Sequence, residues 1–276
     1  MLRKKIQVGL TFLFLLFSTV KAQDTIPERF LNDFKSYYQT YSTHDIAENL
    51  KETYAQENAY AKLNYTFYHK IYYNQPLLED YIRTVLKQLL PNAPEVDNYE
   101  IYITRSTEFN AFTINDGTIF VNIACLAQLS SEAELAFLMA HEYAHYQLEH
   151  GKRSFVKKFE NKKRKTSLKE LQQLNAFSQK NEMASDSLAM VMGTNAGYDA
   201  RAMDLLIQKL IFLQKKQVLQ FSESYNSQLL YPTSHPVGEE RLLQIKSIAP
   251  VNDRGSLYII GEDEFNKVKR LAEYEF

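Results

Sequence analysis

The sequence predicts an α+β fold that is predominantly helical, with a small β-sheet beside one buried helix. Three observations lead to this prediction. Residues 24–95 contain few turn residues and read as helical, short strand-like runs follow between 99 and 122, and an apolar helix pattern covers 131–150. With 276 residues, 45% of them hydrophobic, the chain can bury a full core in one large or two small domains.

The first residues have the pattern of a secretory signal peptide, which we assign to 1–22. Arg3, Lys4 and Lys5 precede an apolar run, and Ala22 ends a stretch with small residues where a signal peptidase reads them. We therefore expect cleavage after Ala22 and a mature protein that is periplasmic or secreted. An uncleaved membrane anchor is the alternative, although the apolar run is short for a membrane span.

An N-terminal helical region is expected over 23–98, followed by a main domain over 99–276. Pro76 suits a helix start, and the turn residues of 91–94 end the helical pattern. The buried stripe of this helix should consist of Tyr81, Ile82, Val85, Leu86, Leu89 and Leu90. A packing layer over the main domain is the simpler role for the region, and a substrate-facing module is the alternative.

The β-sheet should begin with a short strand at 101–103. Asn115-Asp116-Gly117 is a strong signal for a tight turn between two further strands. Strands beside the helix at 131–150 can accept an extended peptide as an added strand, held by backbone hydrogen bonds.

The helix predicted over 131–150 carries His141-Glu142-Tyr143-Ala144-His145, a match to H-E-x-x-H. Ser131 and Glu134 have the form of a capping box at its start, and Gly151 is a plausible stop. The helix is apolar around much of its circumference, which is typical of a buried helix. Histidines four residues apart share one face, so their imidazoles can converge on one ion, which would also supply the partners that buried polar groups need.

This pattern is typical of a catalytic zinc site. Zinc binds imidazole nitrogens readily, and a catalytic zinc keeps one tetrahedral position open for water. Glu142 directly follows the first histidine, where it can take a proton from that water. Two histidines on a helix surface are the alternative explanation, which the apolar context makes weaker.

A catalytic zinc needs a third protein ligand. The extended pattern H-E-x-x-H-x-x-G-x-x-H is absent, because Leu148 occupies the glycine position and His150 falls one residue early, at the wrong helical phase. The better candidate is Glu182, which shares one face of a second helical segment with Asp186. Glu182 can bind the metal, while Asp186 can accept the outer N–H of a metal-bound histidine. For the E-x-x-x-D pattern alone, a solvated helix face is the alternative.

From about residue 100 to about residue 248, the chain resembles the M48 family of zinc metallopeptidases. The resemblance rests on ordered motifs: Asn110-Ala111-Phe112, then 117–122, then the H-E-x-x-H helix with His150-Gly151 at its end, then Glu182 to Asp186, and finally Ser234-His235-Pro236 with Arg241. Ser234 stands where threonine is commoner in the family. The transmembrane helices of the membrane-embedded members are not found, so the resemblance implies the soluble branch.

The resemblance implies a zincin-like metallopeptidase domain over 99–276 that binds one zinc ion per chain. It assigns His141, His145 and Glu182 as zinc ligands and Glu142 as the general base. It also places His235 near the metal, where the imidazole can donate to a developing oxyanion or occupy the fourth metal position in a resting state. A surface histidine is the alternative for His235. Arg241 is expected to brace Glu182 or Asp186.

Composition and charge limit which partners and which cysteine chemistry the chain can have. The net charge of −1 gives no electrostatic case for a nucleic-acid partner. Cys125 is the only cysteine, so no intrachain disulfide can form, and we expect a buried, unreactive thiol. Residues 152–165 are strongly basic, with Glu160 as their one acidic residue. A solvated helix or loop is the simplest explanation of this run, and a lid over the cleft or a peripheral contact with an anionic membrane surface are the alternatives.

These observations together predict a secreted zinc-dependent endopeptidase that acts on proteins or peptides, with a role in removing misassembled envelope proteins. A metal-binding assembly factor or chaperone-like protein with latent peptidase activity is the competing hypothesis. An exopeptidase is less favoured, because the sequence offers no clear group to anchor a substrate terminus. The sequence does not indicate the natural substrate or the oligomeric state.

Overall fold

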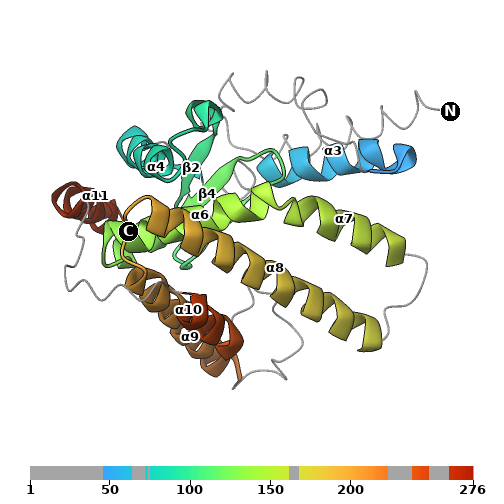
Figure 1. Cartoon of the computed structure of the whole chain (residues 1–276). Coiled ribbons are helices and arrows are strands. Elements are labelled where there is room, and N and C mark those ends of the chain that lie inside the picture. The colour runs from blue at the N-terminus through green and yellow to red at the C-terminus, as the bar shows by residue number, and fades with distance from the viewer. Residues whose placement is uncertain are drawn as a thin grey trace. The chain divides into compact units, whose positions relative to one another are not determined.

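The computed structural model describes residues 46–63, 72–73, 75–161, 168–222, 238–248 and 261–275. All of them belong to one compact unit of the chain, Tyr41–Phe276. Helices predominate, and they surround one small sheet (Figure 1). The predicted α+β, predominantly helical class is therefore confirmed.

The elements follow one another in an order that keeps the strands together. The helices are α3 (Glu48–Leu63), α4 (Pro76–Leu89), the 3₁₀ helix η2 (Pro94–Asn98), α5 (Ile123–Gln128), α6 (Glu132–Gln147), α7 (His150–Asn161), α8 (Leu168–Asn195), α9 (Arg201–Ser222), α10 (Glu239–Ile248) and α11 (Glu262–Glu275). The strands are β1 (Tyr72–Tyr73), β2 (Ile101–Thr104), β3 (Ala111–Thr113) and β4 (Ile119–Asn122).

The sheet has the strand order β1-β2-β4-β3, so β3 is an outer strand. Strands β2 and β4 run parallel, and β3 pairs with β4 in an antiparallel hairpin. The turn of this hairpin lies at the predicted position, with Gly117 in the left-handed region at a φ of 87°. The Asp116 carboxylate accepts a hydrogen bond from the amide of Thr118, which closes the turn.

Helix α4 covers the sheet and packs against α6. Pro76 occupies its first turn, as the sequence predicts. Its buried residues are Leu78, Ile82, Val85, Leu86 and Leu89. The predicted stripe is thus largely confirmed, except that Leu78 joins it while Tyr81 and Leu90 are only partly buried. Residues 76–89 form a packing layer of the main core, and the boundaries at 22/23 and 98/99 stay predictions.

Helix α6 is central to the core, because nearly all of its residues are buried and α8, α9 and α4 pack around it (Figure 1). The predicted cap is confirmed: the Ser131 hydroxyl accepts a hydrogen bond from the amide of Glu134. The Glu134 carboxylate in turn accepts a hydrogen bond from the amide of Ser130, one residue before the expected donor.

The prediction that this helix continues to residue 150 is wrong. Helix α6 ends at Gln147, and Glu149 adopts a φ of 53°, which turns the chain into α7. Gly151 is therefore not a stop but lies in the first turn of α7. A Cβ atom at this position would lie 1.8 Å from Oδ1 of Asn115, so a larger residue here would require the Asn115 side chain to shift.

The second layer is formed by α8, which runs beside α6, and by α9 and α10 (Figure 1). Helix α7 packs against α3 through a smaller apolar cluster that includes Tyr54 and Phe155, whose rings meet edge to face. Within the described residues, no helix combines the length and apolar composition needed to cross a bilayer. The predicted signal peptide at 1–22 lies outside these residues.

Candidate metal centre

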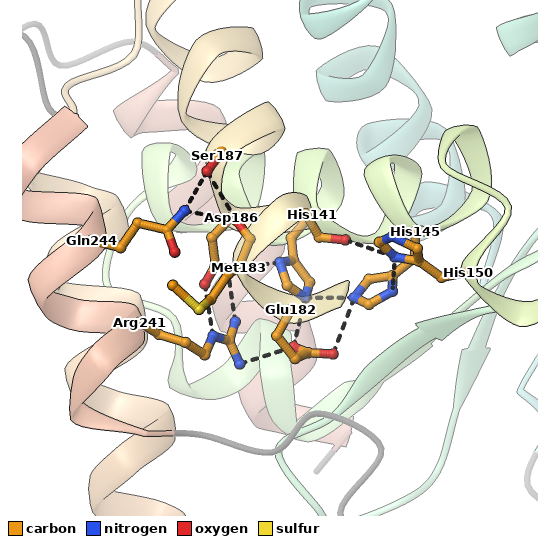
Figure 2. Close-up of polar contacts among 10 residues, drawn as sticks. His141, His145, His150, Glu182, Met183, Asp186, Ser187, Arg241 and Gln244 are labelled. Carbon is orange, nitrogen blue, oxygen red and sulfur yellow. Dashed lines mark hydrogen bonds and ion pairs between the residues drawn. The ribbon is translucent and has the colours of Figure 1, made fainter. Parts of the chain in front are cut away.

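Two adjacent helices bring together the three residues predicted to bind metal. His141 and His145 project from one face of α6, and Glu182 faces them from α8 (Figure 2). The two Nε2 atoms lie 3.0 Å apart, and each lies 3.3 Å from a carboxylate oxygen of Glu182. The three side chains form a group in which all ligand atoms lie within 4.8 Å of one another.

The spacing of these atoms fits a zinc ion. Bonds of about 2.0–2.1 Å to a tetrahedral zinc place its ligand atoms about 3.3–3.4 Å from one another. The observed separations of 3.0–3.3 Å are close to this value. Two imidazoles and one carboxylate also form a donor set typical of catalytic zinc, in which the fourth position is left for water.

The outer side of His141 contacts a carboxylate. Its Nδ1 lies 3.0 Å from Oδ1 of Asp186, one helical turn after Glu182. Burial alone would lower the pKa of His141, but the carboxylates of Asp186 and Glu182 raise it to about 10. The same negative charge that favours a proton on this imidazole would favour a metal cation, which has to displace that proton to bind.

Arg241 stabilises both carboxylates, as the sequence led us to expect. Its Nε and Nη2 each donate to Asp186 at 2.7 Å, and its Nη1 lies 2.9 Å from Glu182 (Figure 2). Burial alone would raise the pKa of Asp186, but hydrogen bonds from His141 and Arg241 hold it below its ordinary value. Gln244 adds a second link between α10 and α8, donating at 3.0 Å to the carbonyl of Met183.

The predicted base, Glu142, is buried on α6 beside the two histidines. The hydroxyl of Thr113 on the outer strand β3 lies 3.5 Å from Oε2 of Glu142. The backbone of β3 therefore passes close to the carboxylate that would handle the proton. Sequence reasoning did not single out Thr113, because its importance depends on the pairing of β3 with β4.

His150 is the functional candidate that sequence reasoning rejected. It is outside the three-residue metal group, yet its imidazole is buried and its Nδ1 lies 3.1 Å from Nδ1 of His145. Ser185 of α8 approaches the same nitrogen, with its hydroxyl oxygen 3.3 Å away. Burial, assisted by the nearby charge of Arg153, lowers the pKa of His150 to about 4, so the ring is neutral at pH 7.

Three other sequence predictions concern this part of the chain. Cys125 is buried, as predicted, and burial raises its thiol pKa well above the ordinary value. In the basic run, Lys152 departs from a solvated face, because it is buried and pairs with Glu149 at 2.6 Å. His235 lies outside the described residues, so its role stays a prediction.

Comparison with known proteins finds similarity to one peptidase family. The model of peptidase family M48 matches residues 75–161, which include the H-E-x-x-H helix and the sheet. Over this segment, the chain is similar to peptidase family M48. The matched segment ends before Glu182, which the fold brings to the two histidines of the motif.

The chain is also similar to curated proteases. It is 23% identical over 232 residues to the beta-barrel assembly-enhancing protease of Escherichia coli (strain K12), covering 73% of this chain and 45% of that protein. The protein of the same name from Yersinia pestis is 26% identical over 164 residues, 49% of this chain and 33% of its own length. The mitochondrial metalloendopeptidase OMA1 of Bos taurus is 36% identical over 63 residues, 23% of this chain and 12% of that protein. The chain thus spans less than half the length of these relatives.

Proposed function

We propose that this chain is a zinc-dependent endopeptidase that cleaves proteins or peptides. The observation that carries the proposal is the convergence of His141, His145 and Glu182 on one point, beside the buried carboxylate of Glu142. A structural zinc site would be closed by four protein ligands, whereas three ligands next to a carboxylate are typical of a hydrolytic site.

The chain's residues divide the chemistry among them. A bound zinc ion supplies a Lewis acid that polarises a peptide carbonyl and makes a water molecule more acidic. Glu142 takes the proton from the attacking water and passes it to the leaving amine. Asp186 holds His141 through its outer nitrogen, and Arg241 keeps Asp186 charged and holds Glu182 in place.

Strand β3 is the proposed docking edge for an extended substrate. It is the outer strand of the described sheet, and its Thr113 lies next to Glu142. A peptide added beside β3 would be held by its backbone, which places an internal bond near Glu142. Recognition of the backbone needs no substrate terminus, and this favours endopeptidase over exopeptidase activity.

For the biological setting, we propose a periplasmic or secreted enzyme that removes misassembled envelope proteins. The signal-peptide pattern at 1–22 and the printed name of the Escherichia coli relative support this setting. The remaining basic residues of 152–165 would allow a peripheral contact with an anionic membrane surface. His235 is proposed to act at the metal, either on the oxyanion or as a resting ligand.

The deciding experiment measures metal content by mass spectrometry and cleavage of casein, an unfolded substrate, with and without chelator. We expect one zinc per chain and cleavage that the chelator abolishes. Absence of bound zinc would refute the proposal. One zinc without cleavage would favour the competing function, an assembly factor with latent peptidase activity, which the word "assembly-enhancing" in the relatives' name also suggests.

A further inference from the structure

His150 contacts a metal ligand although it does not belong to the metal group. Its Nδ1 lies 3.1 Å from Nδ1 of His145, on the side of that ring opposite to Glu182 (Figure 2). His141 has the equivalent arrangement, since its Nε2 faces Glu182 while its Nδ1 faces Asp186. Each of the two histidines therefore has a partner on its outer nitrogen, a carboxylate in one case and an imidazole in the other.

The turn between α6 and α7 brings His150 to this position. In a continuous helix, His150 would be rotated by about 140° from His145, away from the metal face. Glu149 instead adopts a φ of 53°, so α7 starts in a new direction. This left-handed conformation is uncommon for a residue other than glycine. Glu149 is held there in part by its ion pair with the buried Lys152, at 2.6 Å.

The start of α7 also lies close to the β3–β4 hairpin. Gly151 packs so closely on Asn115 that no larger residue fits without a shift. Asn115 in turn donates a hydrogen bond of 2.7 Å to Asn58 of α3. The ring itself contacts His145 of α6 and Ser185 of α8, so the His150 imidazole is held between these two helices.

The chemistry of a metal-bound imidazole assigns the hydrogen atoms. A neutral histidine that binds metal through Nε2 keeps its hydrogen on Nδ1, which must then donate. The atom facing Nδ1 of His145 is Nδ1 of His150, so that nitrogen has to accept. We propose that His150 is a positioning residue, which accepts this hydrogen bond and holds His145 in the tautomer and orientation that present Nε2 to the metal.

This inference rests on the proposed zinc function, and its test measures metal binding rather than turnover. His150→Leu removes the acceptor at similar volume, whereas His150→Asn keeps an acceptor oxygen at the position of Nδ1. Zinc affinity is measured by competition with a chromophoric chelator. We expect the Leu variant to bind zinc roughly 10–100-fold more weakly and the Asn variant to recover most of this loss. Gln147→Ala, an exposed change on the preceding turn, is the matched control and should bind zinc normally.

Two results would overturn the inference while leaving the zinc site intact: equal zinc affinity in the wild-type and Leu proteins, or equal losses in the Leu and Asn variants, which would indicate packing alone. A wild-type chain that binds no zinc would instead refute the proposed function as well.

A measurement on the unmutated protein guards against misfolded variants. In ¹⁵N NMR spectra of the zinc-loaded chain, Nδ1 of His145 should be protonated and Nδ1 of His150 unprotonated, and the reverse assignment contradicts the inference.

Discussion

At the scale of single residues, the site consists of buried charges that depend on one another. Glu182 and Asp186 are both almost fully buried, and Arg241 contacts both. Removing one member of a buried charge cluster leaves the others without compensation, which costs far more than losing an exposed ion pair. The residues of the site should therefore differ sharply in what their replacement changes.

Glu142→Gln should separate catalysis from metal binding. The amide has a similar shape but cannot accept the proton of the attacking water. We expect normal folding and one zinc per chain, with casein cleavage reduced by a factor of about 10² to 10⁴ or more. Near-normal cleavage by this variant would remove Glu142 from the role of general base.

Arg241→Met should destabilise the metal-free protein. The change leaves Asp186 and Glu182 without their shared cation, at a cost of about 3–5 kcal/mol in the free energy of unfolding. Denaturant unfolding in the presence of chelator measures this difference. Arg201→Met is the control, because Arg201 is exposed and, among the described residues, pairs with Asp199, and it should have little effect. Similar small effects of both changes would show that Arg241 does not hold the site together.

At the scale of elements, the contact between α6 and α8 determines the site, since each helix contributes to the candidate metal group. Gly193 allows this contact to be close. A Cβ atom at position 193 would lie 2.3 Å from the ring of Phe137, which is fully buried on α6. The ring has no room to withdraw, so the two helices would have to separate.

Gly193→Ala should therefore destabilise the protein although alanine is the better helix former. The gain of about 1 kcal/mol in helix propensity is outweighed by about 1–3 kcal/mol or more of overpacking strain. Thermal unfolding should show a lower melting temperature, and adding Phe137→Leu should restore part of the loss. Asn195→Ala, an exposed change on the same helix, is the control. A Gly193→Ala variant at least as stable as the wild type would contradict this account of the α6–α8 contact.

At the scale of the whole molecule, metal binding should be coupled to stability. A ligand that binds only the folded chain adds about 2.7 kcal/mol at a concentration 100 times its dissociation constant. Excess zinc should thus raise the melting temperature of the chelator-treated protein by several degrees. Glu182→Ala should lose most of this increase, because it removes a ligand from the group. An equal increase in that variant would indicate that zinc binds elsewhere.

The sequence was most informative where local pattern decides the structure. The cap at Ser131, the hairpin turn at Gly117 and the helix from Pro76 were predictable because short-range hydrogen bonds and apolar spacing determine them. The convergence of Glu182 on the histidines could only be suggested, since it depends on how α8 packs against α6. Strand β1 was missed because two residues carry no alternation, and its strand geometry comes from pairing with β2.

His150 is a residue for which the local sequence pattern gave the wrong prediction. The prediction assumed a continuous helix, in which its phase is wrong, and one residue in the left-handed region reverses that conclusion. Ser185 left a clearer signal, because it stands three residues after Glu182 and one before Asp186, on the same face of α8. All three positions of this face contact the two histidines of the candidate metal group or their neighbour His150.

The place of Arg241 in the chain has a consequence for the order in which the protein is made. During synthesis, both histidines and Glu182 emerge well before α10, which supplies the guanidinium that neutralises the two buried carboxylates. Until α10 docks, burial of α8 against α6 leaves these two carboxylates with the histidines of α6 as partners but without their arginine. In the proposed peptidase, this order would postpone assembly of the cutting centre until most of the chain is complete, so that a half-made enzyme would be kept from digesting its unfolded neighbours.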